Sequence, residues 1–304
     1  MKFFYTDHFE LPLPESHTFP MSKYRLLRER ILASNEIPNE SLQVPDGATD
    51  VQLRRVHTSA FIERVKSGTL DTEELRRIGF PWTEFAVERS RRSVGATIAA
   101  AHSCLEDGYG VNLAGGTHHS FSDAGAGYCV FNDVAVAIRE LQTRRLVANA
   151  VVIDCDAHQG DGTAVIFQSD PSVFTFSIHA SKAFPARKQV SDLDVALADG
   201  TDDAEYLEKL NAALRQVADS ISPDIVFYVA GADPFRGDRL GRLAMTKAGL
   251  QQRDAMVLDW CASVGAPVAT SMAGGYAEHV PDIVDVHFQT ASAIWSRYSA
   301  QCDM

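Results

Sequence analysis

Hydrophobic residues follow two different spacings along the chain, and the change falls near Tyr109. Before that point apolar residues recur every three or four positions, which is the spacing of helices with one buried face. We expect helices over residues 22–33, 57–65, 72–78 and 84–105. The pattern therefore predicts an N-terminal helical layer over about residues 1–108.

Beyond Tyr109, short β-rich apolar runs alternate with amphipathic helices. We expect strands over residues 110–113, 150–153, 173–178, 225–229 and 268–272, and helices over 133–143, 162–168, 204–220, 247–263 and 283–295. Repetition of strand, crossover helix and strand forms a parallel sheet that is covered on both faces. We predict an α/β fold, with residues 1–304 forming a single domain around a mostly parallel multi-stranded sheet flanked by helices.

Composition narrows the choice of partners. Lys and Arg number 28 against 40 Asp and Glu, a net charge of −12, which argues against a nucleic-acid partner and slightly favours a cationic substrate. The apolar stretch before Asp7 is too short for the hydrophobic region of a signal peptide, and no later apolar run is long enough to span a bilayer. The five cysteines form no C-x-x-C pair, as expected for buried thiols in a reducing compartment. We expect a cytoplasmic protein without a membrane partner.

Polar and glycine residues follow each expected strand. In parallel α/β sheets, ligands bind beyond the carboxyl ends of the strands, so these segments are where function is expected. The segments are residues 114–119, 154–162, 177–179, 230–233 and 273–276. We expect all five to meet at one edge of the sheet.

Asp154, Asp156 and His158 form the strongest local signal, because alternation along an extended chain places them on the same side. A zinc ion takes nitrogen and oxygen ligands and leaves one position open in catalytic sites, so Asp156 and His158 need a third ligand. Asp233, at the end of another strand, is the best candidate. Alone it would be interpreted as a turn or helix-capping residue, but the three together favour a metal site.

Adjacent histidines, His118 and His119, lie in a glycine-rich loop. A carboxylate on one nitrogen of each ring would fix its tautomer and raise its basicity. Asp154 and Asp161 are both within reach. Two carboxylate ligands would cancel the charge of the metal ion, so a separate base such as His119 is needed.

Five motifs, taken in order, resemble those of histone deacetylases. They are Gly115–His119, Asp123–Asp133, Asp154–Gly162, Gly231–Asp233 and Gly274–Tyr276. The resemblance extends from about Phe4 to Trp295, and the segment Gly237–Gly241 is most similar to class IV enzymes and their bacterial homologues. It implies the arginase/deacetylase fold, with catalytic motifs between residues 113 and 276. It also implies a zinc-dependent amidohydrolase that removes an acetyl or longer acyl group from the ε-amine of lysine in a protein or peptide.

The resemblance also implies a role for each matched residue. Asp156, His158 and Asp233 would bind Zn²⁺, with Fe²⁺ as an alternative; His118 and His119 would be the acid/base pair, oriented by Asp154 and Asp161; Tyr276 would donate its hydroxyl to the substrate carbonyl. The Gly127 carbonyl would hold the substrate amide, with Tyr128 and Phe184 as tunnel walls, although Phe184 fits a core position equally well. A structural K⁺ ion would be bound around Asp154, Asp156, His158, Ser177 and Ile178.

Other functions stay open at this point. Ureohydrolases such as arginase share the sheet but bind two manganese ions, and Phe235 stands where they need a second carboxylate. An acetylpolyamine deacetylase would use the same chemistry on a small acylated amine, and a silent module would bind acyl-lysine without cleaving it. Lys23 is expected as a solvated helix residue.

Overall fold

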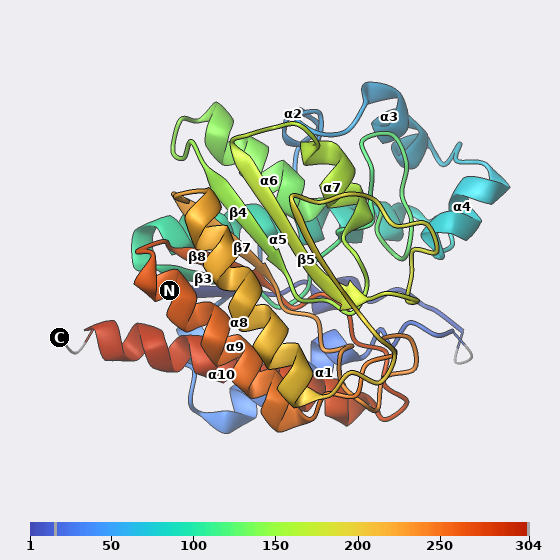
Figure 1. Ribbon diagram of the computed structural model, residues 1–304. Helices are drawn as coiled ribbons and strands as arrows, with labels where there is room; N and C mark the ends of the chain where they lie inside the picture. The colour runs from blue at the N-terminus through green and yellow to red at the C-terminus, as the bar shows by residue number, and fades with distance from the viewer. Residues whose placement is uncertain (15–16, 303–304) are drawn as a thin grey trace.

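The computed structural model describes residues 1–14 and 17–302. Within them a sheet runs in the order β2-β1-β3-β8-β7-β4-β5-β6, and every neighbouring pair of strands is parallel (Figure 1). The strands are β1 (Lys2–Phe4), β2 (Leu42–Gln43), β3 (Tyr109–Asn112), β4 (Ala150–Asp154), β5 (Val173–Ala180), β6 (Leu193–Leu197), β7 (Ile225–Val229) and β8 (Val268–Ser271). This confirms the predicted single α/β domain, with a sheet that is wholly parallel rather than mostly so.

Helices cover both faces of the sheet (Figure 1). One layer holds α2 (Asp50–Leu53), α3 (Ser59–Ser67), α5 (Glu84–Asp107), α6 (Asp133–Thr143) and α7 (Asp161–Phe167); the other holds α1 (Lys23–Ser34), α8 (Asp203–Ser220), α9 (Lys247–Ser263) and α10 (Val280–Cys302). A short helix, α4 (Thr72–Ile78), precedes α5. None of these helices is both long enough and apolar enough to cross a bilayer.

Two hydrophobic cores result, one on each face of the sheet. Along β4, Val151 and Ile153 point into the core shared with α8, α9 and α10, whereas Ala150 and Val152 point into the core shared with α5 and α6. Both sets are buried because a central parallel strand is covered on each side. This is why the central strands have continuous apolar sequences.

Three strands of the sheet, β1, β2 and β6, were missed by the hydrophobic pattern. β1 and β2 lie in the segment predicted to be helical, and they form one edge of the sheet. β6 forms the other edge and alternates exposed and half-buried residues along Leu193–Leu197. Strands of two to five residues at a sheet edge are too short and too exposed to show a periodicity.

The five predicted strands are neighbours in the sheet, in the order β3-β8-β7-β4-β5. Because they are parallel, their carboxyl ends lie along the same edge. The loops that follow them carry the candidate chemistry, so the topology brings together segments from residue 114 to residue 276.

Candidate active site

Asp156, His158 and Asp233 lie together beyond the carboxyl ends of β4 and β7. One atom from each side chain lies within 4.8 Å of the other two, and all three residues are buried. His158 Nδ1 lies 2.9 Å from Asp156 Oδ1 and 2.9 Å from Asp233 Oδ2. An imidazole nitrogen with two carboxylate oxygens is a donor set that zinc accepts.

The cluster concentrates negative charge in a buried position. Burial and repulsion from Asp156 raise the pKa of Asp233 to about 7. Burial also opposes ionisation of Asp156, but its hydrogen bond with His158 and the charge of His118 hold its pKa well below the usual value. A divalent cation would offset the cost of two buried carboxylates so close together. The donor atoms and the charge therefore fit a divalent metal ion.

The backbone approaches this cluster closely at Gly274, in the turn that follows β8. Its N–H group donates a hydrogen bond of 2.9 Å to Asp156 Oδ2. A Cβ atom at this position would lie 2.1 Å from Asp233 Oδ2 and 2.5 Å from Asp156 Oδ2. Glycine is thus required here, because any side chain would displace both carboxylates.

His118 and His119 lie in the loop after β3. His118 Nδ1 lies 2.6 Å from Asp154 Oδ2, and His119 Nδ1 lies 2.6 Å from Asp161 Oδ1. The two Nε2 atoms are 3.1 Å apart. Each carboxylate orients its ring through Nδ1, which leaves Nε2 to exchange protons. The structure contains both histidine–aspartate contacts that the sequence predicted.

The two rings differ in their affinity for a proton. Burial disfavours the charged form of His118, but the charge and hydrogen bond of Asp154 outweigh it and raise its pKa to about 9. Burial and repulsion from His118 lower the pKa of His119 to about 4, although Asp161 opposes this shift. His119 is therefore neutral near pH 7 and able to accept a proton, whereas His118 is charged.

His119 and His158 line a cavity of about 420 Å³. The predicted residues in its wall are His119, Gly127, Tyr128, His158, Phe184 and Tyr276. Phe184 is 44 % exposed, and its ring centroid lies 4.7 Å from that of His119, so the core alternative for Phe184 is wrong. The ring centroids of Tyr128 and Tyr276 are 5.9 Å apart. Aromatic side chains thus surround the approach to the two histidines.

A much smaller chamber lies beside the metal cluster. It has a volume of about 30 Å³, and its wall includes Gly115, His118, Asp156 and Tyr276. A cavity needs about 10–15 Å³ to hold one water molecule, so the chamber accommodates only a small group.

Comparison with known proteins places the chain in a family. Residues 17–291 match the histone deacetylase domain. The chain belongs to the histone deacetylase family. This result sets aside the ureohydrolase alternative.

Several known proteins resemble the chain over most of its length. An uncharacterized protein of Picosynechococcus sp. is 45 % identical over 283 residues, which cover 93 % of this chain and 94 % of that protein. Histone deacetylase 2 of Arabidopsis thaliana is 29 % identical, with 86 % of this chain and 70 % of that protein covered. The crystal structure of an HDAC homolog complexed with SAHA has a TM-score of 0.85 at 25 % identity, covering 98 % of this chain and 84 % of that one.

In the present member of the histone deacetylase family, the turn that carries Tyr276 is held by two residues to which the sequence analysis gave no role. Asp238 Oδ2 accepts a hydrogen bond of 2.5 Å from the Tyr276 N–H group, and Asp238 Oδ1 accepts from the N–H groups of Leu240 and Gly241. Arg239 donates from Nε to the Tyr276 carbonyl at 3.0 Å. Both residues lie in the segment Gly237–Gly241, so that motif was the signal available.

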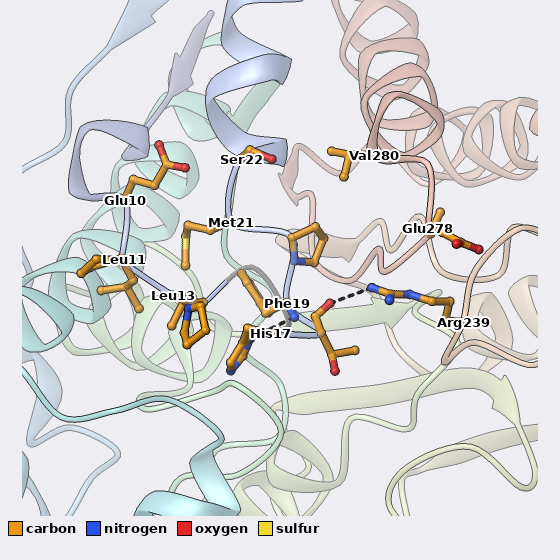
Figure 2. A pocket seen from close by; sticks show the side chains of 15 residues that line it. Glu10, Leu11, Leu13, His17, Phe19, Met21, Ser22, Arg239, Glu278 and Val280 are labelled. Atoms are coloured by element: carbon orange, nitrogen blue, oxygen red, sulfur yellow. Dashed lines mark hydrogen bonds between the residues drawn. The ribbon is translucent and has the colours of Figure 1, made fainter.

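Arg239 also borders a second, larger cavity of about 820 Å³ (Figure 2). This cavity lies between residues 10–14 and 17–22 on one side and residues 277–280 on the other. Arg239 donates from Nη2 to the Thr18 carbonyl at 3.1 Å, so it connects this N-terminal loop to the Tyr276 turn. None of the predicted site residues lines the larger cavity, so the larger of the two cavities is not the candidate active site.

Lys23 is buried, so the prediction that it is a solvated helix residue is wrong. Only 2 % of the residue is exposed. Its Nζ atom donates to the carbonyls of Ala273 at 3.2 Å and Gly275 at 3.3 Å, and it lies 5.3 Å from the Tyr276 ring centroid. Lys23 therefore supports the turn that lies between the metal cluster and Tyr276.

Two further buried charges support the loops of the site. Asp133 accepts hydrogen bonds from the N–H groups of Gly116 (3.0 Å) and Thr117 (2.7 Å), directly before His118. Arg253 donates to the Gly231 carbonyl at 2.6 Å, two residues before Asp233. Asp133 ends the motif Asp123–Asp133, which was the signal available for it. An Arg within a helix is ordinary in sequence, so no local signal marked Arg253.

The predicted potassium ligands lie on the adjacent strands β4 and β5 and in the loop after β4. Ser177 pairs with Asp154 in the register of β4 and β5. Ser177 Oγ lies 3.0 Å from His179 Nδ1, and both residues are buried. Potassium binding stays a prediction.

Proposed function

We propose that this protein is a zinc-dependent lysine deacetylase of the class IV type. The observation that carries the proposal is that the cluster Asp156–His158–Asp233 and the two histidine–aspartate pairs lie beside one cavity, which His119, His158 and Tyr276 line. The family match supports a deacetylase, and the sequence of Gly237–Gly241, which resembles that of class IV enzymes, supports the class IV assignment.

Asp156, His158 and Asp233 are the residues that would hold the metal ion, Zn²⁺ by preference and Fe²⁺ as the alternative. When bound, the ion would act as a Lewis acid that polarises the acyl carbonyl and acidifies water. We keep a K⁺ ion beside Asp154 and Ser177 as part of the proposal.

The chain's own residues would move the protons of the reaction. A water oxygen attacks the acyl carbon, and its proton passes to His119, which is neutral and oriented by Asp161. The C–N bond then breaks, and the same proton is delivered to the departing amine, leaving a carboxylic acid and free lysine. His118 stays charged through Asp154 and provides electrostatic support.

Tyr276 would donate its hydroxyl to the substrate oxygen as negative charge develops there. Burial and the carboxylates of Asp156 and Asp233 raise the pKa of Tyr276 well above its usual value, so the hydroxyl keeps its proton. The Gly127 carbonyl would hold the amide N–H, and Tyr128 and Phe184 would contact the aliphatic lysine stem.

The acyl group we propose is acetyl. The small chamber beside the metal cluster, about 30 Å³, has room for a small group but not for a fatty chain. Chain length is therefore the property of the substrate that this part of the site restricts.

A hydrolysis panel tests the proposal. Metal-loaded protein is assayed on one lysine peptide that carries acetyl, butyryl, octanoyl or myristoyl groups on the ε-amine, with acetylated polyamines in parallel. We expect the acetyl peptide to be cleaved fastest, and a chelator to abolish cleavage. Faster release of long chains would contradict the acetyl assignment, and failure of the metal-loaded protein to cleave any of these substrates would contradict the hydrolase proposal.

A further inference from the structure

The entrance of the 420 Å³ cavity is basic, although the whole chain carries a net charge of −12. Five exposed cations lie in its wall. Arg242 pairs with Asp199, and the other four, Arg76, Arg77, Lys182 and Arg239, are what we call the cationic rim. Among the residues that the structure describes, no aspartate or glutamate lines this cavity. The local charge at the entrance is therefore opposite in sign to that of the chain.

The cationic rim comes from three separate segments, and two of them are tied to the site by hydrogen bonds. The Gly127 N–H group donates to the Arg77 carbonyl at 2.9 Å, and the Tyr128 N–H group donates to the Ile78 carbonyl at 2.7 Å. These bonds fix the end of α4 beside the residues proposed to hold the substrate amide. Gly79, which ends α4 at φ 85°, allows this approach, because a Cβ atom there would lie 2.9 Å from the Tyr128 ring.

The other two segments of the cationic rim carry Arg239 and Lys182. Arg239 is held by its bonds to the carbonyls of Tyr276 and Thr18, which leave its charge uncompensated by these partners (Figure 2). Lys182 lies two residues before Phe184 in the loop after β5.

Two carboxylates near the cationic rim are paired with other cations, and a third, Glu73, is exposed on α4 three residues before Arg76. Glu74 on α4 pairs with Arg64 at 2.8 Å, and Asp199 pairs with Arg242 at 2.5 Å. In the part of the chain that the structure describes, the side chains of Arg76, Arg77 and Lys182 form no ion pair. The hydrogen bond with Arg242 lowers the pKa of Asp199, and the charge of Lys182 adds to this shift. The rim thus presents positive charge to whatever enters the cavity.

We propose that the cationic rim selects acyl-lysine in an acidic peptide segment, with Asp or Glu residues next to the modified lysine. The proposal rests on the deacetylase function above and names its substrate class. A lysine stem that passes between Tyr128 and Phe184 leaves the flanking residues at the entrance, where their carboxylates meet the rim. Acetylpolyamines carry further ammonium groups, which the same rim repels.

The test compares three acetyl-lysine peptides of equal length with acidic, neutral or basic flanks, and N-acetylspermidine. Each exposed charge contact contributes a few-fold at most, so two or three contacts should favour the acidic over the neutral peptide by about tenfold in kcat/KM, mainly through KM. The preference should shrink as ionic strength rises from about 0.05 M to about 0.5 M. Binding of the same peptides, measured by fluorescence anisotropy, reports the preference independently of turnover.

Two double variants assign the effect to the rim. Arg76→Gln/Arg77→Gln should lower kcat/KM for the acidic peptide to nearly that for the neutral one, and leave the neutral peptide unchanged. The control Lys209→Gln/Arg215→Gln removes the same charge from two positions on α8 that do not line the cavity, and should keep the preference. Charge reversal, Arg76→Glu/Arg77→Glu, should shift the preference towards the basic peptide.

Failure of this inference is distinguishable from failure of the proposed function. Equal cleavage and equal binding of the three peptides, or an unchanged preference in Arg76→Gln/Arg77→Gln, would overturn the selection by charge while leaving the deacetylase intact. Absence of cleavage of all peptides by the metal-loaded protein would overturn the proposed function, and the binding measurement would still decide the role of the rim.

Discussion

The Nε2 atoms of His118 and His119 lie 3.1 Å apart, while each ring has a carboxylate oxygen 2.6 Å from its Nδ1 atom. Two rings this close do not readily carry two protons, so they divide the roles of neutral base and charged support. We predict that His119→Ala lowers kcat by about 10²-fold to 10⁴-fold and that His118→Ala costs less. Steady-state kinetics on an acetyl-lysine peptide measures both. A larger loss in His118→Ala would reverse the two roles.

Tyr276→Phe should lose activity without losing structure. The change removes one hydroxyl, and the loss of a single oxyanion donor typically costs about 10²-fold to 10³-fold in rate. Metal content and thermal stability should stay close to those of the wild type, because the ring still packs against Phe19 and Tyr128. Turnover close to wild type in this variant would remove Tyr276 from the mechanism.

Asp233→Ala should abolish tight binding of a divalent metal ion. Two ligands would remain, and the cluster would lose one of its two carboxylates. Metal analysis of the purified protein checks this, together with the rise in Tm that we expect added Zn²⁺ to cause in the wild type but not in the variant. Asp219→Ala, at an exposed position on α8, is the matched control and should keep the metal. Equal metal retention in both variants would contradict the proposed ligand set.

Lys23→Met should weaken the site from a distance. It leaves the buried carbonyls of Ala273 and Gly275 without their donor, which typically costs about 1–3 kcal/mol of unfolding free energy for each unsatisfied group. We expect kcat to fall more than KM rises, because the turn before Tyr276 loses its support. Lys23→Arg keeps a donor and should restore most of the rate. If Lys23→Met loses stability but keeps wild-type kcat, the lysine is structural only.

His57 should make the protein less stable in acid. Burial lowers its pKa to about 4, whereas a histidine in an unfolded chain titrates near 6.5. The unfolded state therefore binds a proton before the folded state does as pH falls. Protonation of His57 leaves the free energy of unfolding unchanged above about pH 6.5 and lowers it between pH 6.5 and pH 4. The loss is about 3 kcal/mol of unfolding free energy.

Denaturant titrations across that pH range measure the effect of His57. The variant His57→Gln should show a shallower decline than the wild type, whereas His279→Gln, at a residue whose side chain is 72 % exposed, should decline in parallel with it. Parallel curves for His57→Gln and the wild type would show that His57 does not titrate in this way.

The central strands, and the polar and glycine residues that follow them, were predictable from the sequence because their signals are local. A buried parallel strand needs a continuous apolar run, and the alternation Asp154, Asp156, His158 follows from the geometry of an extended chain. The five predicted strands are therefore present, and their adjacency brings Asp233 and the histidines to the same edge.

The tertiary structure alone decided the features that depend on distant contacts. Lys23 is buried because carbonyls 250 and 252 residues away accept its hydrogen bonds, and helix spacing contains no trace of them. The sign of charge at the cavity entrance is likewise a property of which side chains converge there, whereas composition reports only the sum over the whole surface. Local periodicity reveals which residues are buried or extended, and only the folded chain determines their neighbours.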